Sequence, residues 1–169
     1  MQSTFKINKH KETLRRWLLT FMILLLISGI TAMPAERELS FATKFFDRGG
    51  DIGNWLNKIY FSVKETGKNY PYLFYGYDWL AFAHIILAIL FIGPYKDPVK
   101  NKWVIEFGMI ACILIIPFAL ILGYVRSIPV WWRLIDCSFG VLGLIPLGIC
   151  YRKINEVVKL STQNSSHEN

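Results

Sequence analysis

Two side chains that can exchange protons, His84 and Asp136, stand within otherwise apolar stretches of the chain. An imidazole changes its charge near neutral pH, so a histidine beside a carboxylate can act as an acid–base pair. His84 follows Asp78 by about 9 Å of helix, and Asp136 follows Trp131 by about 7.5 Å. We therefore expect His84 and Asp136 to lie at the same depth and to meet, if both helices start from the same side of a membrane.

Small and polar residues flank these two groups. Arg133, Asp136, Gly140 and Gly143 fall within about 80° of one another on a helical wheel. Small residues allow helices to approach closely, and polar ones form hydrogen bonds between helices. We expect Arg133 to keep Asp136 ionised, and Arg126 to join at the rim. The candidate binding residues are Arg133, Asp136, His84, Asp78 and Arg126.

This polar cluster allows a structural and a functional interpretation. A buried Arg–Asp–His network can fix the register of packed helices without adding stability. The functional interpretations are proton transfer, binding of an anionic or lipid headgroup, and acid–base catalysis by His84 with Asp136. No metal site and no cofactor are predicted. One histidine inside the apolar stretches cannot supply the two axial ligands of a haem b, and the sequence has no CxxC motif.

The composition indicates the environment of these residues. The 169 residues are 53% apolar and 18% charged, and the mean hydropathy is +0.35. Soluble domains carry about 25% charged residues, so this chain has too little charge for one. Three cysteines exclude a disulfide-stapled scaffold.

Four apolar stretches are long enough to cross a bilayer, which needs roughly 20 residues of helix. The expected fold is all-α: a polytopic membrane protein with four transmembrane helices in a bundle and two amphipathic interfacial helices in the first external loop. The predicted organisation is a basic cytoplasmic tail (1–16), a first span (17–33), an external segment (34–78), a second span (79–95), a cytoplasmic loop (96–102), a third span (103–124), an external loop (125–130), a fourth span (131–151) and a cytoplasmic tail (152–169).

The external segment has its own pattern. Pro34 followed by acidic residues is typical of a helix start, Gly49-Gly50 predicts a break, and a second helix is expected over 51–64. Two short amphipathic helices tethered at both ends are expected to lie in the membrane interface. The alternative is a cap over the bundle or a docking surface. The aromatic run 70–79 is either an interfacial belt or the mouth of an aromatic-lined pocket.

Lysine and arginine set the orientation. Cytoplasmic segments close to the ends of transmembrane helices are rich in lysine and arginine. If both termini are cytoplasmic, this holds for the segments before the first span, between the second and third spans, and after the fourth span. Residues 1–32 also resemble a signal peptide, but Ile30 stands where a small residue is required for cleavage. We favour an uncleaved anchor in the cytoplasmic membrane.

The leading functional hypothesis is a small integral membrane accessory or interaction protein with a polar cluster toward the outer leaflet. Its expected partners are the lipid bilayer and a membrane protein or a second copy of the chain, without nucleic acid, because no basic stripe with interleaved aromatic residues is present. One alternative is a membrane enzyme that acts on a lipid or quinone-like substrate with His84 and Asp136 as acid–base pair. The other is a proton-coupled carrier that works as an oligomer.

Overall fold

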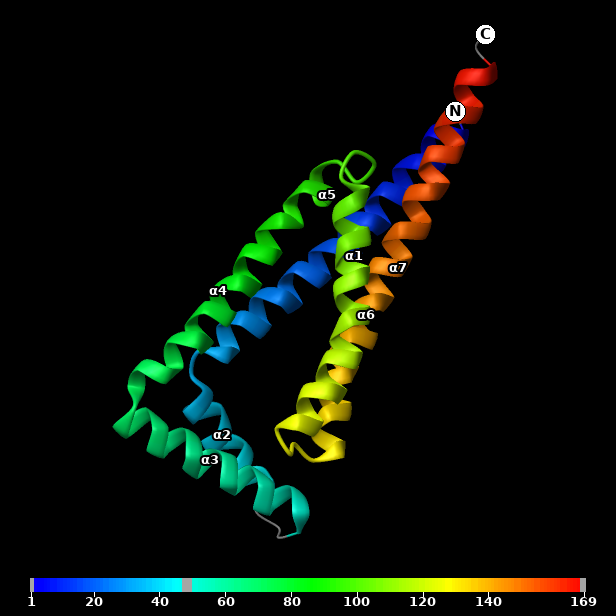
Figure 1. Cartoon of the computed structure of the whole chain (residues 1–169). Coiled ribbons are helices and arrows are strands. Elements are labelled where there is room, and N and C mark those ends of the chain that lie inside the picture. Colours follow the sequence, from blue (N-terminus) through cyan, green and yellow to red (C-terminus); the bar gives the residue numbers. More distant parts are fainter. Residues whose placement is uncertain (1, 47–49, 168–169) are drawn as a thin grey trace. The chain divides into compact units, whose positions relative to one another are not determined.

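The computed structural model describes residues 2–46 and 50–167, with side chains described for 7–46 and 50–162. Every regular element in that part of the chain is a helix (Figure 1). Four described stretches are long and apolar enough to cross a membrane, namely Ile7–Ala32, Pro71–Lys96, Lys102–Val125 and Val130–Thr162. The predicted all-α class and the four apolar helices are thus confirmed, and they are typical of an integral membrane protein.

The chain forms two compact units, one of Met1–Ile23 with Ile89–Asn169 and the other of Leu24–Ala88. In the first unit, α6 (Lys102–Val125) and α7 (Val130–His167) lie side by side (Figure 1). The helices approach closely at Gly140, where a Cβ would clash with the carbonyl oxygen of Cys112. A Cβ on Gly143 would lie 2.7 Å from Cys112 Sγ. Small residues on α7 therefore face Cys112 of α6 and allow the two helices to approach closely.

A tight turn joins α6 to α7. Ser127 has a φ of 56°, and the Ile128 N–H donates to Gly123 O at 2.8 Å. A left-handed residue followed by this long backward bond is the Schellman ending of a helix. Pro129 then prevents α6 from continuing, because proline has no N–H to donate. The turn reverses the chain and sets α7 antiparallel to α6.

The N-terminal part of α1 (Gln2–Ala32) packs in the same unit. Leu14 and Leu18 have no exposed surface. The thiol of Cys150 on α7 points at Leu14 O, with 3.8 Å between sulfur and oxygen. The rings of Phe21 and Phe91 have centroids 4.8 Å apart. Residues 2–16, predicted as a basic tail, are thus a continuous helical extension of the first span.

The second predicted span is divided into two helices. It consists of α4 (Tyr75–Leu90) and the short α5 (Ile92–Lys96), with a break at Phe91. Pro94 explains the break, because it cannot donate a hydrogen bond to the carbonyl of Leu90. The Asn101 amide then donates to Gly93 O at 3.2 Å and fixes the turn that leads to α6.

In the second unit, α2 (Ala35–Phe46) and α3 (Asp51–Asn69) form a helical hairpin (Figure 1). The predicted break lies between them; Gly49 is outside the described residues, and Gly50 has φ 90° and ψ 179°. This backbone conformation is open essentially to glycine alone. A Cβ on Gly53 would lie 3.0 Å from Phe46 O, so the two helices approach closely near the break.

The chain leaves α3 through a single-turn 3-10 helix, η1 (Pro71–Phe74), which leads into α4. The Phe74 ring lies against α3, because a Cβ on Gly67 would be 3.5 Å from its Cε2. In the same unit, Gly29 of α1 permits close contact with α4, since a Cβ there would lie 2.9 Å from Ala81 O. Gly67 and Gly29 therefore allow the close contacts of η1 with α3 and of α1 with α4.

Candidate functional site

His84 lies half-buried on the face of α4 that is buried at Ala81 and Ala88. Its Nδ1 is 2.8 Å from the carbonyl oxygen of Leu80, one turn earlier. A tautomer with the proton on Nδ1 satisfies this bond and leaves Nε2 as a hydrogen-bond acceptor. A Cβ on Gly29 would lie 2.9 Å from His84 Cβ, so α1 holds the base of the side chain in place.

Asp136 and Arg133 lie half-buried near the start of α7. The Arg133 Nε–H donates to Ile128 O at 2.9 Å, and the aliphatic part of the arginine covers Gly123. The ion pairs among the described side chains do not join Arg133 to Asp136. The arginine differs here from our expectation because the turn leaves a carbonyl without a helical partner, and the guanidinium supplies the missing donor.

The other two candidates lie at helix ends. Arg126 is exposed at the end of α6, and Asp78 is exposed in the first turn of α4. Arg126, Arg133 and Asp136 belong to one unit of the chain, whereas Asp78 and His84 belong to the other. The expected contact between His84 and Asp136 would join the two units and stays a prediction.

The three cysteines lie at separate places, and none is bridged. Cys112, Cys137 and Cys150 are all buried, and the thiols of the last two point at backbone carbonyl oxygens. No three residues among the histidines, cysteines and acids of the described chain gather closely enough to hold a metal ion. In the described structure, these cysteines serve as small apolar packing residues.

A cavity of about 250 Å³, here named the α3–α4 pocket, lies between α3, η1 and the start of α4. Its lining comprises Trp55, Lys58, Ile59, Ser62, Val63, Thr66, Leu73, Phe74 and Tyr77. Lys58 carries the one charge among these described residues. Its Nζ lies 5.8 Å from the centroid of the Trp55 ring. The indole Nε1 is buried and has no hydrogen-bond partner among the described residues.

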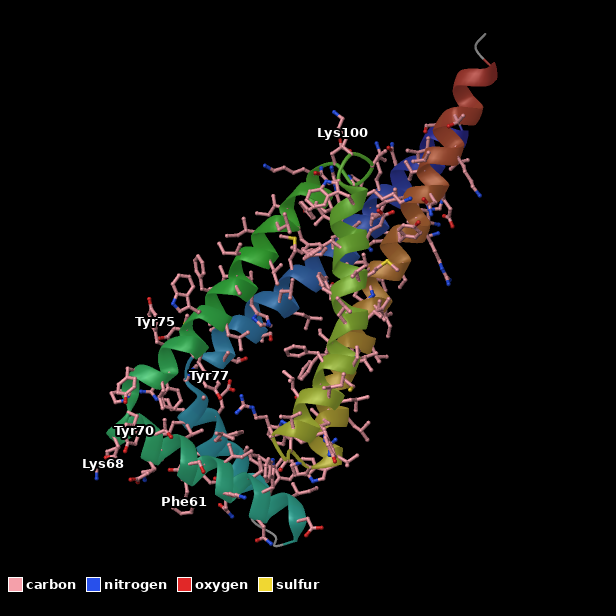
Figure 2. The ribbon with its side chains drawn as sticks, viewed as in Figure 1. Phe61, Lys68, Tyr70, Tyr75, Tyr77 and Lys100 are labelled. Atoms are coloured by element: carbon pink, nitrogen blue, oxygen red, sulfur yellow. The ribbon has the colours of Figure 1, made fainter. Side chains whose placement is uncertain are left out.

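Phe74 and Tyr77 of the lining belong to a run of aromatic residues that continues on both sides of them. Figure 2 shows Tyr70, Tyr75 and Tyr77 where α3 leads into α4. The ring of Tyr75 meets Trp79 edge to face, with centroids 5.9 Å apart. Leu73 is 57% exposed, so the pocket has an apolar rim open to its surroundings. Leu73, Phe74 and Tyr77 of the aromatic run thus line a pocket, and the two roles predicted for the run, an interfacial belt and a pocket mouth, both stay predictions.

Lys58 and the polar residues of this pocket were not among the binding residues predicted from the sequence. Trp55, Ser62 and Thr66 recur at intervals of seven and four residues, which places them on one face of a helix. That spacing was the available signal. The spacing alone does not distinguish a pocket lining from the apolar face that packs a helix against its neighbours, because Trp55 and Ile59 also fit such a face.

Searches of protein-family models, of curated proteins and of solved structures find no match for this chain.

Proposed function

We propose that the chain is a small integral membrane accessory protein whose α2–α3 hairpin binds the surface of the bilayer. Both termini are cytoplasmic in this proposal, and the hairpin lies on the outer side of the cell membrane. The hairpin follows α1 and is joined to α4 by η1, and α1 and α4 both belong to apolar stretches long enough to span a membrane. The hairpin is thereby tethered within reach of the lipid headgroups.

One surface of α2 carries the proposal. Phe41 and Phe45 are 65% and 67% exposed, and their ring centroids are 5.0 Å apart. Arg37 and Lys44 lie within about 60° of Phe41 around the helix. Exposed aromatic rings flanked by basic side chains are typical of helices that insert into the headgroup region of anionic membranes.

The hairpin also keeps apolar side chains exposed on α3. Phe61 is 65% exposed and projects from α3 away from α2 (Figure 2). No residue of α2 is buried. Exposed apolar surface of this kind marks a site of membrane or protein contact. The basic flanks of Phe41 and Phe45 favour lipid over a protein partner.

The polar cluster has a place in this proposal as well. Arg126 directly follows α6, Arg133 lies in the first turn of α7, and Asp78 lies in the first turn of α4. If the four apolar stretches cross the membrane alternately, these charges lie on the same side as the hairpin. Arginine side chains at that level attract lipid phosphates, whose charge they complement.

A photo-crosslinking amino acid tests the hairpin contact. We expect Phe41→p-benzoylphenylalanine to form adducts with phospholipid in native membranes, detected by mass spectrometry of the intact protein. The matched control is Glu36→p-benzoylphenylalanine, because Glu36 is also exposed on α2 but lies about 140° away around the helix. An adduct of position 41 with another protein, or equal lipid adducts at both positions, would contradict the proposal.

A further inference from the structure

The α3–α4 pocket combines hydrogen-bond donors with an apolar wall. Lys58 provides an ammonium group, Trp55 an indole N–H, and Tyr77 a hydroxyl group. The described lining contains no carboxylate. Such a set of donors complements a group that is rich in acceptor oxygens and negatively charged. Ile59, Val63 and Phe74 complete the pocket with apolar surface.

The indole of Trp55 is the group that lacks a partner. Its Nε1 is buried without a hydrogen bond among the described residues. Buried N–H groups are paired in most structures, so an orphan of this kind calls for an explanation. Lys58 is exposed, and its Nζ lies 5.8 Å from the centroid of the same ring. An acceptor that enters the pocket then gains a hydrogen bond that the free protein lacks.

The size and position of the pocket restrict its ligand. A volume of about 250 Å³ equals that of about eight water molecules, which is too small for a whole phospholipid. It suits a phosphate group with the adjoining glycerol and the first carbons of one acyl chain. Leu73, Phe74 and Tyr77 of the wall belong to the apolar stretch Pro71–Lys96. The most abundant amphiphile beside such a stretch is the lipid of the membrane itself.

We propose that the α3–α4 pocket binds one anionic phospholipid. Its phosphate contacts Lys58 and the Trp55 N–H, and one acyl chain lies along Ile59, Val63 and Phe74. Both donors belong to neighbouring residues on α3 that line the same pocket, and hydrogen bonds to an ionised phosphate are stronger than those between neutral groups. This site is separate from the exposed phenylalanines of α2, so each proposal can fail without the other.

The test counts lipids on the full chain by native mass spectrometry in mild detergent, with phosphatidylglycerol as titrant. We expect one tightly bound phosphatidylglycerol and at least about tenfold weaker binding by Lys58→Gln, since a hydrogen bond to a charged group is lost. Trp55→Phe keeps the ring and loses the N–H, and it is expected to bind about threefold to tenfold more weakly.

Matched controls separate this site from a general attraction of basic residues. Lys64→Gln removes the same charge from α3 outside the pocket and should change affinity by less than about twofold. Lys58→Arg keeps the charge and should retain affinity within about threefold. Unchanged binding by both Lys58→Gln and Trp55→Phe would overturn the proposal. So would an equal loss in Lys64→Gln, or equal affinity for phosphatidylcholine.

A second measurement does not depend on how well a variant tolerates detergent. Phosphatidylglycerol with brominated acyl chains quenches nearby tryptophans in nanodiscs that hold the full chain. The difference in quenching between the unmodified protein and Trp55→Phe reports Trp55 alone, and we expect it to be clearly positive. No difference would overturn the lipid assignment. Displacement of the lipid by millimolar inorganic phosphate would overturn it too and indicate a site for free phosphate.

Discussion

Gly140 lies at a close approach of α6 and α7. A Cβ at this position would clash with the backbone oxygen of Cys112, and a backbone atom cannot rotate away as a side chain can. Gly148, two turns further along α7, has nothing within 4 Å of the corresponding Cβ position. The two glycines share a helix and differ only in what faces them, so they form a matched pair.

We expect Gly140→Ala to lower the free energy of unfolding by about 1–3 kcal/mol, because overpacking forces the two helices apart. Gly148→Ala should leave it unchanged or raise it by up to about 1 kcal/mol, since alanine favours the helix. Unfolding by SDS in mixed micelles, followed by circular dichroism, measures both. Equal stability of the two variants would contradict the close packing described for Gly140.

The candidate site was predictable from residue types only in part. The wheel placed Arg133, Gly140 and Gly143 on one face of α7, and in the structure the two glycines do meet α6. The partner of Arg133 was not predictable, because a long side chain can reach several acceptors within one turn of helix. The choice of Ile128 O depends on the shape of the turn before α7, which local sequence does not determine.

At the scale of elements, the α2–α3 hairpin depends on how its two helices are connected. Gly50 adopts φ 90° and ψ 179° directly before α3, and the Asn54 N–H donates to Gly50 O at 3.0 Å. A side chain at Gly50 would strain this conformation by about 1–3 kcal/mol. Gly76, within α4, has an open Cβ position and serves as the matched control.

We expect Gly50→Ala to increase hydrogen exchange of the first turns of α3 by about tenfold, because the strain favours local opening of the hairpin. Gly76→Ala should leave exchange in α3 unchanged. Hydrogen–deuterium exchange with mass spectrometry of the full chain in detergent resolves these peptides. Unchanged exchange in the first variant would mean that the connection tolerates a side chain at Gly50.

The elements themselves were largely predictable from the sequence. Length and apolarity indicated the four long helices, and the glycine pair marked the break before Asp51. The predicted helix ends were less accurate, because a helix continues beyond its apolar stretch where another helix packs against it. Ile154 and Val157 are buried on α7, beyond the predicted end of the fourth span at Tyr151. Their spacing of three residues is helical, but in isolation it did not distinguish a packed helix from a tail.

At the scale of the whole chain, the first and last helices meet. His10 Nδ1 lies 3.3 Å from Glu156 Oε2, and Cys150 Sγ lies 3.8 Å from Leu14 O. Both contacts lie within one unit of the structure. If the four apolar stretches cross a membrane, these contacts bring the ends of α1 and α7 to the same side of it, which agrees with an even number of crossings. The contacts therefore support the proposed common location of the two termini.

Cysteine labelling of sealed vesicles tests this topology. We expect Lys9→Cys and Lys159→Cys to react with an impermeant maleimide from the same side, and Lys64→Cys to react only from the other. The native thiols give a low background, because Cys112, Cys137 and Cys150 are 6%, 9% and 0% exposed. Labelling of position 64 from the side of positions 9 and 159 would contradict the proposed arrangement.

The contact between Leu14 and Cys150 has a consequence for the order of assembly. It closes a separation of 136 residues. Ribosomes add about 5–20 residues per second, so Cys150 is synthesised roughly 7–27 s after Leu14. During that interval, lipid or the insertion machinery must shield the apolar surface around Leu14 in the nascent chain. The packing of α1 is therefore completed only when the α7 segment around Cys150 has been made.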